Sequence, residues 1–227
     1  MKRTVFTTTI LILVVMLFVT ALAYAFNLPK FFGFNRRNAL EEWEEKIFKN
    51  KVIYTVEHKA GEGYLNAESD RACSGLIYKM KFSPRNFPMM SWGWKVIKFP
   101  DKNKLIPNDS GWIEKDDYAA RVYVIFSGFS FMQTRSIEYI WDETLPEGTI
   151  FTSPYFKNIK LIVAESGSGK LGEWVIEQRN ILDDYKKAFG SPPLMGVAAI
   201  AIMTDTDNTL STAEAQYKDI KVGYKNE

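Results

Sequence analysis

Three charged side chains stand inside strand-like segments, where charge is expensive. Residues 118–126 are rich in β-branched and aromatic residues, and Arg121 lies among them; Glu177 and Arg179 lie in a later segment of the same kind. Because alternate residues of a strand face opposite sides, Arg121 shares its face with Tyr123, and Glu177 shares its face with Arg179. A buried charge without a partner is costly. These residues are therefore expected to line a cleft or to form ion pairs.

We expect the two segments to belong to one sheet, with Arg121 and Glu177 close together. One interpretation is a structural ion pair between them. The other is a polar, concave face that binds a ligand. The sequence is compatible with both.

A second polar group follows an apolar stretch near the C-terminus, where Asp205, Asp207 and Asn208 stand close together. Their oxygens are ligands that calcium favours, but such residues also form turns by bonding their own backbone. An EF-hand loop is excluded because Leu210 replaces the required Gly and Gln216 replaces the required Glu. We predict no cofactor, and we keep Asp205 and Asp207 as the ligands should a calcium ion bind. We also expect this group to converge with Arg121 and Glu177.

Aromatic residues are frequent on the expected strands. Flat rings can stack on sugars while planar polar groups meet the hydroxyls, although most strand aromatics belong to the core. We expect Trp92 and Trp94 to be buried and Trp141 to be exposed. The predicted ligand-binding residues are Arg121, Tyr123, Trp141, Glu177, Arg179, Asp205, Asp207 and Asn208.

Enzyme chemistry has weaker support. With the acidic residues above, Asp116 and Asp117 supply enough carboxylates for the acid and base of a glycosidase. His58 is the single histidine and Cys73 the single cysteine. We expect His58 on the surface rather than in a catalytic triad, and zinc sites of Cys and His need more ligands than this. We predict no catalytic residue.

We expect the first residues of the chain to form an export signal or a membrane anchor. Lys2 and Arg3 precede an apolar run, which ends in small residues at Ala23 and Ala25. This pattern is typical of a secretory signal over residues 1–25. The alternative is an uncleaved anchor in the inner membrane over residues 4–26, which is long enough to span a bilayer.

Charge and cysteine content agree with export. Removing Lys2 and Arg3 leaves 27 basic and 27 acidic residues, so no basic footprint for nucleic acid is present. A single cysteine forms no internal disulfide, which favours a bacterial envelope. We predict a periplasmic or secreted protein that contacts membrane only through its N-terminal segment. A linker is expected over residues 26–37 and one domain over residues 38–227.

The domain is predicted to be a mostly β, jelly-roll-type sandwich. Hydrophobic residues are 46% and aromatic residues 15% of the chain, enough for a packed core, and many short strand patterns are separated by turn residues. Leu40, Trp43 and Ile47 predict a short helix over residues 39–48. A late helix is predicted to begin at Asn180 and to end at Gly190.

Four segments together resemble a bacterial family of proteins with domain of unknown function 3047. They are SWGWKV at 91–96, DDYAARVYV at 116–124, LGEW and EQRN within 171–180, and MTDTDNT at 203–209. The resemblance runs from about Val52 to Val222. It implies an envelope setting and a galactose-binding-like jelly roll, similar to many carbohydrate-binding modules, but carries over no activity.

The function predicted from the sequence is recognition of a polysaccharide or glycan by an envelope β-sandwich. The first alternative is a carboxylate-dependent carbohydrate hydrolase or lyase. The second alternative is a partner-binding envelope factor without a small ligand. A deep cleft with unpaired carboxylates would favour the enzyme, and a polar face without a cleft would favour the partner-binding factor.

Overall fold

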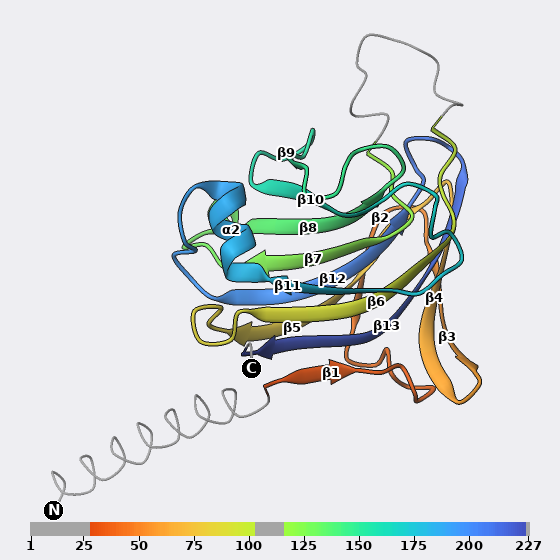
Figure 1. Cartoon of the computed structure of the whole chain (residues 1–227), viewed down its shortest axis with the longest axis horizontal. Coiled ribbons are helices and arrows are strands. Elements are labelled where there is room, and N and C mark those ends of the chain that lie inside the picture. Colours follow the sequence, from red (N-terminus) through yellow and green to blue (C-terminus); the bar gives the residue numbers. More distant parts are fainter. Residues whose placement is uncertain (1–27, 103–115, 226–227) are drawn as a thin grey trace, which may run out of the picture.

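The computed structural model describes residues 28–102 and 116–225, which form two β-sheets packed face to face (Figure 1). The predicted signal or anchor segment lies outside the described residues. The first sheet has the order β11 (Val175–Asn180), β6 (Met89–Lys98), β13 (Thr212–Tyr224), β4 (Glu62–Asp70) and β3 (Ile53–Lys59), with β1 (Lys30–Phe32) also paired to β13.

The second sheet has seven strands. Its order is β2 (Glu44–Lys49), β5 (Cys73–Phe82), β12 (Val197–Asp205), β7 (Arg121–Phe126), β8 (Arg135–Asp142), β10 (Ile159–Ser166) and β9 (Ile150–Thr152). All its neighbours are antiparallel except β8 and β10, which are parallel. The predicted mostly β sandwich is confirmed.

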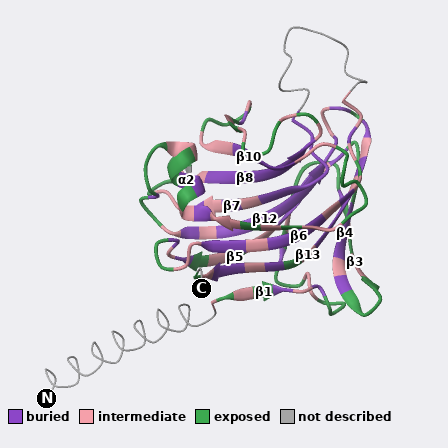
Figure 2. Cartoon of the chain, in the orientation of Figure 1, coloured by how far each residue is buried: buried purple, intermediate pink, exposed green. Residues whose placement is uncertain are grey.

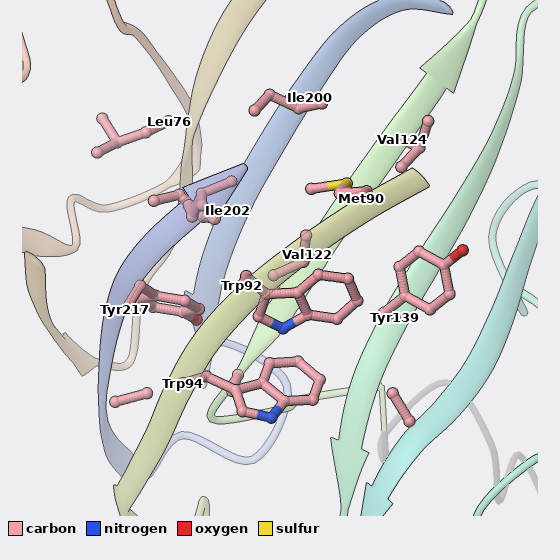
Figure 3. Packing of buried hydrophobic residues seen from close by; sticks show 14 of the residues in the cluster. Leu76, Met90, Trp92, Trp94, Val122, Val124, Tyr139, Ile200, Ile202 and Tyr217 are labelled. Atoms are coloured by element: carbon pink, nitrogen blue, oxygen red, sulfur yellow. The ribbon is translucent and has the colours of Figure 1, made fainter. Parts of the chain in front are cut away.

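The core lies between the sheets and is rich in aromatic rings (Figure 3). Trp92 and Trp94 of β6 are fully buried, as predicted, and the Trp92 ring lies 5.0 Å from the ring of Tyr139 on β8. Val122 and Val124 of β7 point into the same core. The inward side of each central strand is buried along most of its length (Figure 2). Strand alternation thus leaves the odd-numbered residues of β7 on the outer face of the second sheet.

The late helix, α2 (Ile181–Phe189), is confirmed together with both of its caps. The Asn180 side chain accepts hydrogen bonds from the N–H groups of Leu182 and Asp183, at 3.2 and 3.1 Å. Gly190 ends the helix with φ +74°, a left-handed conformation that glycine adopts without strain. The described residues also include a short 3₁₀ helix, Phe131–Gln133.

The predicted helix over residues 39–48 is wrong. This part of the chain forms turns followed by β2, which pairs with the edge of β5. Of the three residues that predicted the helix, Trp43 is buried and Leu40 packs against the core, but Ile47 is 52% exposed. The open edge of β5 offers backbone hydrogen bonds that outweigh a weak local helix preference.

Part of the expected linker belongs to the sandwich. Within residues 26–37, β1 pairs with β13, and both Phe32 and Phe34 are buried in the core. Among the described residues, no helix has the length and apolar character needed to cross a membrane.

Candidate functional site

A pocket of about 370 Å³ lies on the outer face of the second sheet. Arg121, Tyr123 and Ile125 reach it from β7, because their neighbours Val122 and Val124 point into the core. Other lining residues come from β2, β5, β8, β12 and three loops; they include Phe48, Cys73, Asp116, Glu138, Tyr155, Phe156, Met203, Asp205, Asp207 and Asn208.

Arg121 lies at the centre of an acidic cluster and is only 4% exposed. Its Nη1 donates to Glu138 Oε1 at 2.7 Å, and its Nε lies 3.0 Å from Asp205 Oδ1. Its Nη2 lies 3.5 Å from Asp116 Oδ1 and also donates to the Asp116 backbone carbonyl. Three carboxylates therefore share one guanidinium. Tyr123, whose hydroxyl accepts from Nη1 at 3.2 Å, stands directly opposite Glu138 in the β7–β8 register.

Burial shifts the three acids toward their neutral forms, and the single guanidinium does not reverse the shift. Burial raises the pKa of Glu138 to about 7, with Arg121 opposing the shift and Asp116 adding to it. Burial also raises the pKa of Asp205 and Asp116, again against the attraction of Arg121. One buried cation cannot offset three buried anions. Near neutral pH Glu138 therefore retains part of a proton that an exposed glutamate would have lost.

The turn after β12 forms the polar rim of the pocket. Asp117 is fully buried and accepts hydrogen bonds from the N–H groups of Asn208 and Thr209, at 3.3 and 2.6 Å. Lys49 donates to the Asp207 backbone carbonyl at 2.9 Å, and its Nζ lies 3.9 Å from Asp207 Oδ2. Burial and then the Asp117 carboxylate raise the pKa of Asp207. Asp117 thus holds the turn, and the half-buried Asp207 faces the pocket.

Aromatic side chains form another part of the rim. Phe48 is 62%, Tyr155 47% and Phe156 65% exposed, although all three line the pocket. The Tyr155 hydroxyl donates to Asn208 Oδ1 at 3.0 Å, which joins the aromatic side of the rim to the polar side. The pocket therefore combines exposed flat rings with carboxylate and amide groups.

The sequence matches the model of the family described as Protein of unknown function (DUF3047) over residues 41–221. The chain belongs to this family. The resemblance in the sequence is thereby confirmed. A search of the curated proteins returned no match.

Solved structures with a similar arrangement of strands include proteins that bind or cleave polysaccharides. The family 30 carbohydrate-binding module of a Clostridium thermocellum cellulosomal cellulase has a TM-score of 0.44 at 8% identity, covering 82% of this chain and 93% of that chain. The xyloglucanase domain of NopAA from Sinorhizobium fredii has a TM-score of 0.44 at 9% identity, covering 81% and 93%. A variant of the Cel12A cellulase of Rhodothermus marinus has a TM-score of 0.44 at 10% identity, covering 79% and 94%. Similarities this distant bear on neither ligand nor activity.

Five of the eight predicted site residues lie together in the pocket: Arg121, Tyr123, Asp205, Asp207 and Asn208. The predicted convergence of the turn after β12 with Arg121 is confirmed by the 3.0 Å approach of Asp205. Their role in binding stays a prediction.

The predicted approach of Arg121 to Glu177 is wrong, because the two residues belong to different sheets. Glu177 stands opposite Trp92 on β6, and burial, with repulsion from Glu165, raises its pKa to about 7. Arg179 bonds both oxygens of Asp184, at 2.9 and 3.0 Å. Glu177 and Arg179 therefore lie outside the pocket. Arg179 has a structural role, because its bonds to Asp184 join β11 to α2.

Trp141 is also outside the pocket. Its side chain is fully buried in the core, where its Nε1 donates to the Gly167 carbonyl at 2.9 Å. The expectation of an exposed ring is wrong because Trp141 follows Ile137 and Tyr139 on the inward face of β8.

Several pocket residues were not predicted. Glu138 carries the same signal as Arg121, a charge in the middle of an apolar strand, so the same reasoning could have found it. Cys73 follows no motif, and Tyr155 reaches the pocket from a loop whose path no local pattern reveals. His58 is exposed, as predicted.

The predicted calcium ligands, Asp205 and Asp207, lie beside the thiol of Cys73. The sulfur of Cys73 and carboxylate oxygens of Asp205 and Asp207 lie within 4.8 Å of one another. Calcium takes about six to eight oxygen ligands, whereas this set contains a thiol, and the Arg121 cation already approaches Asp205. The residues do not fit calcium.

Proposed function

We propose that the protein binds a carbohydrate chain in the outer-face pocket of the second sheet. The observation that carries the proposal is the meeting of exposed aromatic rings with fixed planar polar groups in one pocket. Tyr155 and Phe156 supply the rings, and Asp207 and Asn208 supply the polar groups. Apolar ring faces contact sugar carbons, while carboxylate and amide oxygens accept hydrogen bonds from sugar hydroxyls.

The dimensions of the pocket suit such a ligand. Its volume of about 370 Å³ lies within the usual range of small-molecule sites, roughly 300–1,000 Å³. The Tyr155 ring is exposed to solvent, yet its hydroxyl bond to Asn208 holds it beside the polar rim. A ligand can therefore bind with little reorganisation of the rim.

The state of the carboxylates favours binding over catalysis. Asp116, Glu138 and Asp205 all lie within 3.5 Å of the buried Arg121 guanidinium. A carboxylate that is paired with the Arg121 guanidinium keeps its position, but the pairing hinders proton transfer between that carboxylate and a substrate. Asp207 makes only a distant ion pair, at 3.9 Å to Lys49, and is the acid best placed to contact a sugar.

A hydrolase is the second candidate, and one observation favours it. The pKa of Glu138 is raised to about 7 in the same pocket, which is the property required of a general acid near neutral pH. Asp207 would then be the second carboxylate of the pair that glycoside hydrolysis needs. Release of reducing sugar by the natural protein and its loss in Glu138→Gln would establish this alternative.

Titration calorimetry of the full chain with a panel of soluble oligosaccharides tests the proposal. Tyr155→Ala and Asp207→Asn are each expected to weaken binding by roughly tenfold, equivalent to one lost interaction of about 1.4 kcal/mol. Glu177→Gln is the matched control, since Glu177 lies on the other sheet. Equal affinities in all four proteins, or no binding to any glycan of the panel, would reject the pocket.

We propose that this binding occurs in the bacterial envelope, on the outer side of the inner membrane. The basic start and the apolar run of the N-terminal segment support this placement. Cell fractionation should place the protein in the periplasm or the membrane, and recovery of the full chain from the cytosol would reject it.

A further inference from the structure

One end of the sandwich, here called the α2 end, gathers two apolar loops. Residues 127–134 connect β7 to β8, and residues 190–196 connect α2 to β12. The bases of the loops are joined, because the N–H of Ser127 donates to the Gly196 carbonyl at 2.9 Å. The paired ends Phe126 and Val197 lead directly into them.

Large apolar side chains protrude from both loops. Phe129 is 77% and Met132 78% exposed on the first loop, and Leu194 is 85% exposed on the second. Met195 adds a further 38% exposed side chain beside Leu194. Isolated exposed hydrophobic residues are ordinary, but several on adjoining loops indicate a contact surface.

The first loop closes on itself at its base. A Cβ atom on Gly128 would collide with the backbone of Gln133, so the two backbones touch at this point. Phe129 and Met132 lie in the loop between these two residues, and both side chains are exposed.

Cations surround the apolar loops. Lys187 lies in the last turn of α2, and Arg85 and Lys225 line a common hollow beside the start of β6. All three are exposed, and none forms an ion pair within the described part of the chain. Lys186 also lies here, but Asp183 partly neutralises it at 3.0 Å.

The described chain begins at this same end. Lys30 of β1 pairs with Val222, close to the C-terminal end of β13, and Tyr224 pairs with Met89 at the start of β6. The N–H of Ile181, the first residue of α2, donates to the carbonyl preceding Met89 at 2.8 Å. Figure 1 shows α2 and the start of β1 on the same side of the molecule.

The position of this start limits how far the domain can lie from a membrane. The apolar sequence of residues 4–26 ends two residues before Leu28, the first described residue. An extended chain spans at most about 3.6 Å per residue. If the segment is retained as an anchor, Leu28 is held within roughly 10 Å of the bilayer surface, and the end of the sandwich to which it belongs faces the membrane.

We infer that the α2 end of the sandwich docks onto the surface of an anionic lipid bilayer. Phe129, Met132 and Leu194 enter the interface between headgroups and acyl chains, and Lys187, Arg85 and Lys225 contact the anionic headgroups. The folded domain thus contacts membrane itself, beyond the N-terminal segment to which the sequence assigned all such contact. This inference is independent of the proposed glycan binding.

Docking in this way sets the orientation of the pocket. Asp205 is the last residue of β12, whereas Val197, its first residue, leads from the apolar loop. The acidic cluster therefore lies at the far end of the strand, directed away from the anionic surface. A ligand could reach it while the domain is docked.

Site-specific fluorescence of the full chain, inserted into vesicles by its N-terminal segment, tests the inference. Cys73→Ser removes the native thiol, and Leu194→Cys then carries an environment-sensitive nitrobenzoxadiazole label. Ser168→Cys is the matched control, since Ser168 lies in the exposed turn after β10, at the opposite end. Spin-labelled lipids should quench the label at position 194 several times more strongly than the label at position 168.

Vesicles of phosphatidylcholine with and without phosphatidylglycerol separate the two contributions. The difference in quenching should shrink without the anionic lipid, and it should shrink likewise in Lys187→Glu with the anionic lipid present. Phe129→Ser, with an unchanged melting temperature, should reduce quenching at position 194 in both vesicles. Equal quenching at positions 194 and 168 would overturn the inference. So would a blue shift at position 194 that follows protein density rather than lipid, because it would show contact between two copies.

Discussion

Replacement of Arg121 by methionine is the most direct test of the acidic cluster. Methionine keeps much of the length of arginine but removes the charge and all its donors. The substitution therefore abolishes the ion pairs with Glu138 at 2.7 Å, with Asp205 at 3.0 Å and with Asp116 at 3.5 Å. The three carboxyl groups would stay buried without the guanidinium that pairs with all of them.

The size of the effect follows from this uncompensated charge. Removing one partner of a buried ion pair costs about 3–5 kcal/mol. A domain has about 5–15 kcal/mol of total stability, so Arg121→Met should remove a large share of it. For a chain of this size each kcal/mol lowers the melting temperature by about 2–4 °C, which gives a fall of roughly 6–20 °C.

The cost should also depend on pH. At about pH 5 Glu138 is largely protonated, since burial raises its pKa to about 7, and burial shifts the pKa of Asp205 in the same direction. Neutral carboxyl groups need no cation, so the variant should lose less stability there than at about pH 7.5. The difference between the two pH values is specific to an electrostatic role for Arg121.

Urea and thermal unfolding of the natural protein and the variant at both pH values provide the measurement. Arg179→Met is the matched control, because Arg179 bonds one carboxylate only and its side chain is 25% exposed. Its loss should be smaller than that of Arg121→Met, because only one carboxylate loses a directly bonded cation. An unchanged melting temperature for Arg121→Met, or an equal loss at both pH values, would refute the proposed role of the cluster.

Two further predictions concern single side chains. Glu138 has a folded-state pKa of about 7 against a usual value of 4.5, so its contribution to the free energy of unfolding falls by up to about 3 kcal/mol as pH rises between these values. Glu138→Gln should therefore flatten the measured slope of stability against pH, and an identical slope would contradict the assignment. Asn180→Ala removes the acceptor for two N–H groups of α2 and should cost about 1 kcal/mol in urea unfolding, while Asn180→Asp, which keeps an acceptor, should restore most of it.

Local patterns in the sequence predicted the faces of the strands correctly. Arg121 and Tyr123 alternate with Val122 and Val124, and the structure places the two pairs on opposite faces of the second sheet. The caps of α2 were predicted for the same reason, because each cap and its hydrogen-bond partners lie within a few residues of one another. Strand faces and helix caps depend only on residues that are close together in the sequence, so a short segment is enough to predict them.

The partner of Arg121 could not be predicted in this way. Which strands become neighbours depends on the path of the whole chain, and the sequence placed Glu177 where the structure places Glu138. The predicted helix around Trp43 failed for a related reason, since β2 gains its hydrogen bonds from the distant β5. In both cases a contact between distant segments decided between two locally acceptable outcomes.

The pocket and the core are opposite faces of the same strands, and one register fixes both. Tyr123 stands opposite Glu138 on β7 and β8, while Val122 stands opposite Tyr139 in the next pair. A shift of one residue would turn Glu138 into the aromatic core and Tyr139 out to the pocket. The core rings would resist this shift strongly, because Tyr139 packs 5.0 Å from Trp92 and donates to the buried Asp184 at 2.9 Å. The packing of the inner face therefore holds the acidic cluster of the outer face in its geometry, even though the repulsion within that cluster opposes it.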